Sequence, residues 1–240
     1  MNLIPARLKD ALKSFAGKSI YQPPPTDKLN HSGTVDRYFL PPGYKTRSTP
    51  KYFDDFAPSD VHAVWQPDVY RLADLMAQRV IDVGCGKGEK LQALAKRHEI
   101  IGIDFGGNLE FCRKYPFGTW LEHDLDGDDD LPLAANLFEG ATVICADVLE
   151  HVAKPTRLLR KLQVAASCGA TVILSTPERE LIWGKEHKGP PPNESHLREW
   201  SLAELRSLLE HAGFSVAFMG VTADNDTDRK MMTSLAVLRA

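Results

Sequence analysis

A glycine-rich turn directly after a short apolar run most constrains how this chain can fold. Residues 80–89 read VIDVGCGKGE, so Gly84, Gly86 and Gly88 follow a segment typical of a buried strand. Glycines in such a turn let the backbone bend sharply and approach a ligand without a Cβ in the way. In open α/β sheets, ligands bind beyond the carboxyl ends of the strands. The turn therefore predicts an α/β fold that binds a nucleotide-like ligand.

Strand-like and helix-like patterns alternate from residue 67 onward, which is typical of a doubly wound parallel sheet. We expect seven strands, at residues 79–83, 100–104, 118–122, 141–146, 170–175, 214–220 and 233–239. We expect helices at residues 67–77, 87–97, 107–114 and 155–167, and a last one that Ser201 caps and Gly213 ends. The two final strands follow each other directly, so they should form a hairpin. The prediction is a Rossmann-like, mostly parallel α/β sheet with an antiparallel C-terminal strand.

Residues 1–65 differ from the remainder in composition. Residues 5–16 have the spacing of an amphipathic helix, and prolines recur between residues 21 and 50. We expect a helix and a wrapping lid segment at residues 1–65 and the catalytic or binding domain at residues 66–240. Aromatic residues of the lid could line a pocket; they are Tyr38, Phe39, Tyr44, Tyr52, Phe53, Phe56 and Trp65.

The composition excludes several classes of protein. The net charge of −3 over 240 residues argues against a protein that coats nucleic acid. No apolar run is long enough to span a bilayer, so stable membrane insertion is not expected. The four cysteines show neither a metal-binding nor a disulfide pattern, which indicates reduced thiols and a cytoplasmic protein. A homodimer is compatible with the sequence.

The residues around the turn indicate which ligand it binds. Asp104 ends the second expected strand twenty residues after Gly84, where an acid can bind two ribose hydroxyls. A dinucleotide fold would have glycine where this chain has Glu89. An acid at a helix start repels pyrophosphate but suits a ligand with a cationic amine and sulfonium. Asp82 adds to that preference or orients the loop. The spacing favours a methyl donor over a dinucleotide.

Four segments resemble the motifs of class I S-adenosylmethionine-dependent methyltransferases. VIDVGCGKGE resembles the first motif, IIGIDF (residues 100–105) the ribose-binding second and LEHDL (residues 121–125) the third. CADVLEHV (residues 145–152) resembles the fourth-strand motif of the small-molecule branch, as in quinone-pathway methyltransferases. Residues 65–67, STPERE and GPPPNESHLREWS are similar to bacterial methyltransferases of surface-glycan or secondary-metabolite pathways.

The resemblance implies S-adenosylmethionine as the cofactor and a set of residues that bind it. These are Asp82, Gly84, Cys85, Gly86, Gly88, Asp104, Phe105, Asp124, Leu125, Asp147 and Val148. Asp124 is implied as the partner of the adenine amino group, with Leu125 stacking nearby.

The segments after the fourth and fifth strands contain the candidate acceptor residues. An acceptor hydroxyl must lose a proton, and His151 and His196 are the candidate catalytic bases. The alternative interpretation of His151 is that it opens the following helix together with Glu150. The long segment 175–200 provides the candidate substrate contacts: Arg179 and Lys185 for an anionic group, Trp183 for a flat apolar group, and His187.

No metal site is expected. Glu150, His151 and His187 could form one in principle, but adjacent residues rarely both face one ion. The residue patterns of nucleic-acid and protein arginine methyltransferases are not recognisable here. We therefore expect a methyltransferase that acts on a small molecule or on a glycan or secondary-metabolite precursor, at oxygen. Two alternatives remain: a nicotinamide-dependent oxidoreductase, and a non-catalytic cofactor-binding module that serves a partner protein.

Overall fold

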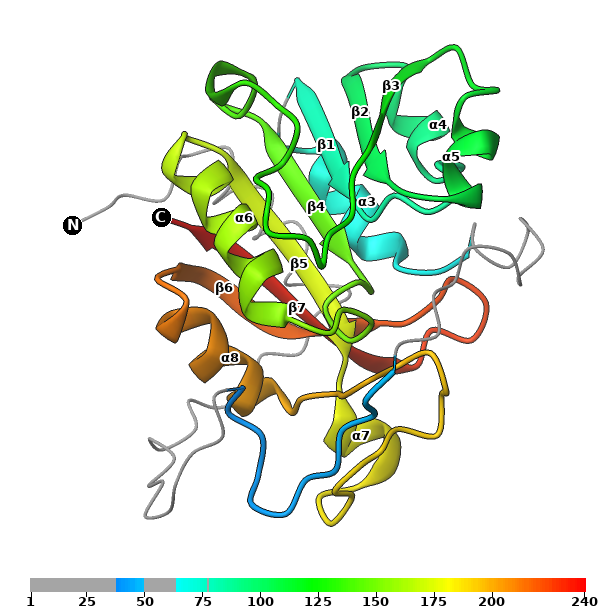
Figure 1. Cartoon of the computed structure of the whole chain (residues 1–240). Helices are drawn as coiled ribbons and strands as arrows, with labels where there is room; N and C mark the ends of the chain where they lie inside the picture. The colour runs from blue at the N-terminus through cyan, green and yellow to red at the C-terminus, as the bar shows by residue number, and fades with distance from the viewer. Residues whose placement is uncertain (1–37, 50–63, 77) are drawn as a thin grey trace.

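The computed structural model describes residues 38–49, 64–76 and 78–240, and these contain one seven-stranded sheet (Figure 1). The strands are β1 (Arg79–Val83), β2 (Glu99–Asp104), β3 (Gly118–Glu122), β4 (Thr142–Ala146), β5 (Thr171–Pro177), β6 (Ser215–Ala223) and β7 (Met231–Arg239). Their order is β3-β2-β1-β4-β5-β7-β6. Strands β1 to β5 pair in parallel, and β7 runs antiparallel to both β5 and β6. The predicted sheet and its antiparallel C-terminal strand are confirmed.

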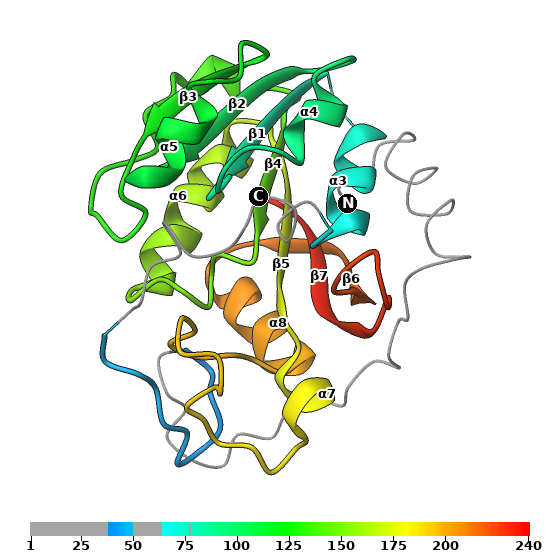
Figure 2. The ribbon, with the colours of Figure 1, turned by 90° about the vertical axis from the view of Figure 1, so that its right-hand side faces the viewer.

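Helices cover both faces of this sheet. They are α3 (Pro67–Asp74), α4 (Leu91–Leu94), α5 (Gly107–Cys112), α6 (Pro155–Ser167), α7 (Arg179–Trp183) and α8 (Leu202–His211), with a short 3₁₀ turn, η1 (Ala135–Leu137). Figure 2 shows α3 and α4 on one side of the strands and α6 and α8 on the other. None of the helices in the described ranges is long and apolar enough to cross a membrane.

Helices α3 and α5 begin where predicted and end earlier, at Asp74 and Cys112, and two other helices differ more from the sequence prediction. Helix α4 begins at Leu91 and not at residue 87, because Gly86 and Gly88 have φ values of +56° and +73° that a right-handed helix does not allow. Helix α7 was not predicted. Its N-cap, Glu178, accepts a 2.7 Å hydrogen bond from the backbone N of Leu181.

Two apolar cores hold the sheet between its helices. On the α6 and α8 side, leucines of both helices pack against β4 and β5. The helix residues include Leu158, Leu162, Leu205 and Leu209, and the strand residues include Val143 and Leu174. On the other side, α3 and α4 pack against β1, β2 and β4 through residues that include Val69, Leu72, Leu91, Val80, Ile100 and Ile144. Burial on both faces explains why the central strands read as nearly continuous apolar runs.

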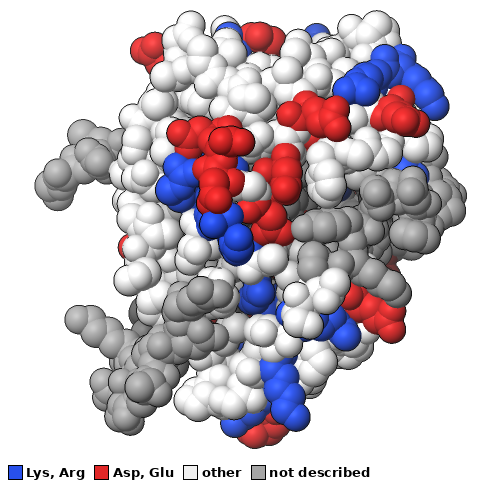
Figure 3. Space-filling view, in the orientation of Figure 1, with Lys and Arg blue, Asp and Glu red and all other residues white. Residues whose placement is uncertain are grey.

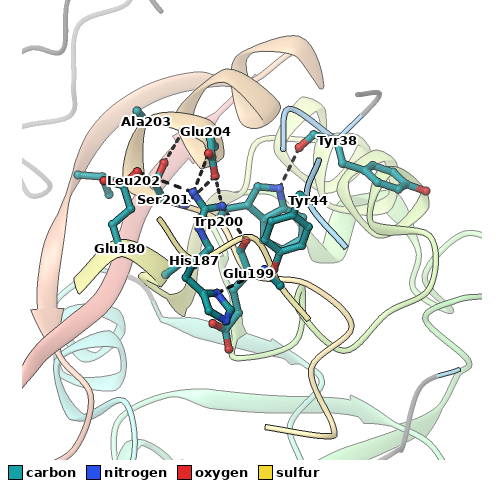
Figure 4. Close-up of polar contacts among 12 residues, drawn as sticks. Tyr38, Tyr44, Glu180, His187, Glu199, Trp200, Ser201, Leu202, Ala203 and Glu204 are labelled. Atoms are coloured by element: carbon teal, nitrogen blue, oxygen red, sulfur yellow. Dashed lines mark hydrogen bonds and ion pairs between the residues drawn. The ribbon is translucent and has the colours of Figure 1, made fainter. Parts of the chain in front are cut away.

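A buried ion pair fixes the start of α8. The predicted capping box is present: Ser201 Oγ accepts from the backbone N of Glu204, and Glu204 Oε2 accepts from the backbone N of Ser201 at 2.9 Å. Arg179 donates two hydrogen bonds to Glu204, at 2.6 and 2.8 Å, and is only 1% exposed. Figure 4 shows Ser201 and Glu204 at the first turn of α8. The loop between α7 and α8 is therefore anchored at both ends.

Residues 38–49 pack against that loop. Trp200 Nε1 donates to the backbone O of Tyr38 at 2.9 Å (Figure 4), and the backbone N of Arg47 donates to the backbone O of Leu197 at 3.0 Å. Tyr38 and Leu40 are buried. The predicted helix at residues 5–16 and three of the predicted lid aromatics, Tyr52, Phe53 and Phe56, lie outside the described residues.

Candidate functional site

A cavity of about 480 Å³ lies where β1, β4 and β5 end. The strands are parallel, so the turns that follow them meet at the same edge of the sheet. The glycine turn, the end of β2 and the segment after β3 line one part of the cavity. The end of β4, the α7–α8 loop and the β6–β7 hairpin line the other part. This volume lies within the usual range for small-molecule sites.

The glycines of the turn have different structural roles. A Cβ on Gly84 would lie 2.4 Å from Cγ2 of Val148, so only glycine allows the turn to contact the end of β4 this closely. A Cβ on Gly86 would have no atom within 4 Å, because Gly86 borders the open cavity. A Cβ on Gly88 would lie 2.9 Å from the ring of Trp120. Gly86 therefore offers backbone to a ligand, whereas Gly84 and Gly88 pack against the protein.

Asp104 joins the glycine turn to the end of β2. Its Oδ2 accepts a 2.7 Å hydrogen bond from the backbone N of Gly86, and its Oδ1 accepts one of 2.8 Å from the backbone N of Phe105. The carboxylate also lines the cavity. Each carboxylate oxygen can accept more than one hydrogen bond. Asp104 could therefore bind ligand hydroxyls while it holds the turn in place.

The segment after β3 forms the far wall of this part of the cavity. Asp124 and the buried Leu125 both line it, next to Phe105. Asp124 Oδ1 accepts from the backbone N of Asp126 at 2.9 Å, which fixes the turn. A carboxylate beside an apolar side chain suits a base with an amino group and a flat ring.

Asp82 lies at the end of β1 behind the turn, and Cys85 is part of the turn. Tyr70 donates a 2.8 Å hydrogen bond from its hydroxyl to Asp82 Oδ2, and Asp82 is 1% exposed and does not line the cavity. Burial raises the pKa of Asp82 to about 6. Of the two interpretations of Asp82, the orienting one agrees with this position. Cys85 lines the cavity, and contact with Cys112 together with burial raises the pKa of its thiol.

Asp147 ends β4 with an unpartnered oxygen. Its Oδ2 accepts from Nε2 of Gln66 at 2.5 Å, whereas its Oδ1 is buried without a hydrogen bond. Oε1 of Gln66 is likewise buried and unpartnered. Burial raises the pKa of Asp147, since the charged carboxylate loses hydration. Both side chains line the cavity, so this part of the cavity suits a ligand that donates hydrogen bonds or carries positive charge.

Two histidines face each other in the acceptor part of the cavity. The rings of His151 and His196 lie edge to face with their centroids 4.7 Å apart. Nδ1 of His151 lies 2.9 Å from the backbone O of Ser195, which makes Nδ1 the protonated nitrogen of a neutral ring. Burial and His196 lower the pKa of His151 to about 3. His151 is therefore a weak base at neutral pH.

Glu199 orients His196. Oε1 of Glu199 accepts from Nδ1 of His196 at 2.5 Å, and the amide of Asn193 lies 3.0 Å from the other ring nitrogen, Nε2. Glu199 is held in turn by Trp183 Nε1, which donates to Oε2 at 2.7 Å, and by a 3.0 Å hydrogen bond from its own backbone N to the hydroxyl of Tyr44. Figure 4 shows Tyr44 next to Glu199. A carboxylate bound to Nδ1 leaves Nε2 as the basic nitrogen, as in hydrolytic triads.

Glu150, His151 and His196 together could hold a metal ion. Their ligand atoms lie within 4.8 Å of one another. Glu150 is fully buried; its Oε2 accepts from the Thr176 hydroxyl at 2.9 Å, and its Oε1 has no hydrogen bond. Two imidazoles and a carboxylate are a donor set that suits zinc and several other divalent cations. His187 is not part of this set, because its ring lies beside Trp183, with the ring centroids 6.0 Å apart.

The candidate substrate residues divide into two groups. Trp183 lines the cavity and is 40% exposed, as expected for a ligand-binding wall. The structure does not bring Arg179, Lys185 or His187 to the cavity lining. Arg179 is instead buried against Glu204, since the chain folds back onto α8 after β5.

Several residues of the site had not been recognised in the sequence. They are Gln66, Tyr70, Lys90, Asn193 and Glu199. Glu199 could have been found from its position three residues after His196, the spacing at which a carboxylate and an imidazole meet in one turn of chain. Gln66 precedes Pro67 at the start of α3. A proline at this position indicates where a helix begins, but it does not indicate a ligand-binding residue before it.

Comparison with known proteins identifies relatives of one kind. The family model described as "Methyltransferase domain" matches residues 51–217. The ubiquinone biosynthesis O-methyltransferase of Aeromonas salmonicida is 29% identical over 164 residues, which are 60% of this chain and 66% of that relative. The enzyme of the same name from Stutzerimonas stutzeri is 33% identical over 108 residues, 44% of this chain and 47% of that relative. The matches thus span about half to two thirds of these relatives' lengths.

A solved structure shares the fold. It is an O-methyltransferase from neocarzinostatin biosynthesis, in complex with S-adenosylmethionine and 2-hydroxy-5-methyl naphthoic acid. The two chains superpose with a TM-score of 0.56 at 19% identity, over 75% of this chain and 54% of the other. At this identity the likeness shows the fold alone.

Proposed function

Because this chain belongs to the family of methyltransferase domains, we propose that it is an S-adenosylmethionine-dependent O-methyltransferase of a small molecule. The observation that carries the proposal is one cavity that joins the Gly86–Asp104 turn to the His196–Glu199 pair. The first suits the cofactor, and the second suits removal of a proton from a hydroxyl. The names of the relatives, which are O-methyltransferases, support oxygen as the methylated atom.

The cavity residues fit this cofactor. When bound, the cofactor supplies a methyl group already activated on a positively charged sulfur. Asp104 would bind the ribose hydroxyls, and Asp124 and Leu125 would bind the adenine. The open space at Gly86 leaves room for close approach of the ligand, and the buried oxygen Oδ1 of Asp147 suits its positive charge. The remaining task of the protein is to orient the acceptor and exclude water.

His196 would act as the general base. Its Nδ1 is held by Glu199, so Nε2 would take the proton of the acceptor hydroxyl. The hydroxyl would then occupy the place of the Asn193 amide, which lies 3.0 Å from Nε2. His151 is less suited, since its pKa is lowered to about 3. The exposed rings of Trp65 and Trp183 line the same part of the cavity and favour an acceptor with a flat apolar group.

A second candidate uses the same side chains to hold a divalent cation. The unpartnered Oε1 of Glu150, with His151 and His196 near it, favours this arrangement. A cation bound there would lower the pKa of an acceptor hydroxyl, so that no base is required. Chelation separates the two candidates: a base requires no metal, and activity would survive exhaustive treatment with a chelator. Loss of activity that Mg²⁺ or Zn²⁺ restores would favour the cation.

The acceptor class follows from charge and shape. Glu199 and Asp224 line the acceptor part, whereas neither Arg179 nor Lys185 lines the cavity. A neutral acceptor, such as a phenolic small molecule or a glycan or secondary-metabolite precursor, is therefore favoured over an anionic one. On the face in Figure 3, acidic and basic side chains lie close together, so this face offers no broad basic surface for nucleic acid. Two of the ion pairs among the described residues join Arg157 to Asp128 and Arg160 to Asp130.

We also propose that the protein works in the cytoplasm. All four cysteines are free thiols in the structure, which suits a reducing compartment. The experiment that tests the proposed function is an acceptor screen with methyl-labelled S-adenosylmethionine, over phenols, sugars, amines and carboxylic acids. Label transfer to a hydroxyl compound, abolished by His196→Gln, is the expected result. Label transfer to nitrogen or carboxylate acceptors alone would contradict O-methylation of a neutral small molecule.

A further inference from the structure

Lys90 lies beside a polar region of the cavity that side chains of α3 and of the ends of β1 and β4 form. It follows the glycine turn, lines the cavity, and its Nζ lies 4.8 Å from the centre of the Tyr70 ring. The Tyr70 hydroxyl bonds to Asp82 and the Gln66 amide bonds to Asp147, so these side chains surround one polar region. Asp104, Asp124 and Leu125 lie in the other part of the cavity.

This polar region contains a cation and two unpartnered acceptor atoms. Burial lowers the pKa of Lys90, while the carboxylates of Asp82 and Asp147 oppose that effect. The desolvated ammonium would therefore gain from an anion that reaches it. Oδ1 of Asp147 and Oε1 of Gln66 are buried acceptors without donors. Buried polar atoms of this kind usually have partners, which indicates that a ligand supplies them.

A ligand that satisfies all three groups has a carboxylate and an ammonium group close together. An amino acid zwitterion has both groups on one carbon. The proposed cofactor is elongated, with adenosine at one end and an amino acid at the other. If Asp104, Asp124 and Leu125 hold the adenosine, the amino acid reaches Lys90.

We propose that Lys90 binds the carboxylate of the cofactor's amino acid end, while Asp147 Oδ1 and Gln66 Oε1 accept hydrogen bonds from its ammonium group. This inference rests on the proposed function, since it requires the cofactor to occupy the cavity. It makes Lys90 the residue that distinguishes the whole cofactor from its adenosine part.

Two ligands that differ only at this end provide the test. S-Adenosylhomocysteine has the amino acid group, and 5′-methylthioadenosine has the same nucleoside and thioether without it. Calorimetric titration of wild type, Lys90→Met and Lys90→Arg with both ligands is the experiment. We expect Lys90→Met to weaken S-adenosylhomocysteine about 10- to 100-fold and to leave methylthioadenosine unchanged, as for loss of one charged hydrogen bond. Lys90→Arg should retain most of the affinity.

Asp104→Ala is the matched control, because a ribose contact is common to both ligands. This variant should weaken both by the same factor. Thermal unfolding of each variant without ligand checks that the fold is intact. Equal losses for the two ligands in Lys90→Met, or no loss, would overturn the inference and leave the proposed function standing. Failure of wild type to bind either ligand would overturn the proposed function, and the inference with it.

Discussion

The carboxylate of Glu199 lies 2.5 Å from Nδ1 of His196, and both residues are buried. The pair is built from a single turn of chain just before α8, whose start is fixed by the Ser201–Glu204 capping box. A rigid helix start therefore holds the proposed base. The other loop histidine, His187, lies four residues after the end of α7, beside the ring of Trp183 and outside the cavity lining.

His196→Gln should lower turnover about 10²- to 10⁴-fold and leave S-adenosylhomocysteine affinity nearly unchanged, because a positioned base acts on the acceptor and not on the cofactor. Glu199→Gln should lower turnover less, since it keeps a hydrogen bond to the ring. His187→Gln is the matched control, with normal turnover. Steady-state kinetics and calorimetry measure these effects. Normal turnover of His196→Gln would exclude His196 as the base.

Asp104→Ala should weaken S-adenosylhomocysteine binding by roughly 2–3 kcal/mol, because a charge-assisted contact to the ribose is lost. The variant also loses the bonds to the backbone N atoms of Gly86 and Phe105. Asp104→Asn keeps one acceptor oxygen and should lose less affinity. Calorimetric titration measures both variants, and equal affinity of Asp104→Ala and wild type would show that the ribose binds elsewhere.

Alanine at Gly84 should mainly lower stability, whereas alanine at Gly86 should mainly weaken ligand binding. Gly84→Ala places a Cβ 2.4 Å from Val148 and adds a side chain at a φ of +80°, so the free energy of unfolding should fall by more than ~1 kcal/mol. Gly86→Ala meets no atom within 4 Å, so apart from the strain of a side chain at a φ of +56° it should mainly weaken S-adenosylhomocysteine binding. Denaturant unfolding and calorimetry separate the two. A stable Gly84→Ala that binds normally would contradict the packing of the turn on β4.

Asp82 should make the protein less stable as pH rises. Its pKa is about 6 in the fold against 3.8 in the unfolded chain, so its contribution is fully present below pH 3.8 and is lost as pH rises through about 6. The difference of about 2 pH units corresponds to roughly 3 kcal/mol. Asp82→Asn keeps an acceptor for Tyr70. Because asparagine does not titrate, the free energy of unfolding of this variant should fall less than that of wild type as pH rises from 3.8 to about 6. Identical pH dependence of the unfolding free energy in both proteins would contradict a raised pKa.

Arg179 should be structural. Arg179→Met leaves Glu204 buried without its partner, which should lower the free energy of unfolding by about 3–5 kcal/mol. Arg179→Met combined with Glu204→Gln should recover part of this loss. Denaturant unfolding gives the energies, and S-adenosylhomocysteine affinity of the folded variant should be unchanged. An Arg179→Met protein with wild-type stability but weaker acceptor binding would contradict this role and show that Arg179 binds the acceptor.

The parts of the fold that local signals define were predictable from sequence. The strands were recognisable because burial on both faces leaves continuous apolar runs, and α8 because its capping box lies within four residues. Helix α7 was not predictable, since Glu178 caps it while also accepting from the backbone N of Leu202, a residue far along the chain. Helix α4 begins later than predicted because the positive φ values of Gly86 and Gly88 extend the glycine turn.

The acceptor part of the site depends on long-range packing, so the sequence defined it poorly. Arg179 and Lys185 looked suited to an anion, but the contact of Arg179 with Glu204 depends on how α7 folds against α8. His196 meets His151 across 45 residues of chain, and no spacing rule predicts such a contact. Likewise, no metal site is expected from the sequence, and the trio that it offers in principle contains His187, whereas the structure brings His196 to Glu150 and His151.

The central claim is that the cavity binds S-adenosylmethionine and not a nicotinamide dinucleotide. Calorimetric titration of the wild-type protein with S-adenosylhomocysteine and, separately, with NADH tests it most directly. We predict saturable binding of S-adenosylhomocysteine with a micromolar dissociation constant and no binding of NADH. Micromolar binding of NADH with no response to S-adenosylhomocysteine would contradict the claim and favour an oxidoreductase.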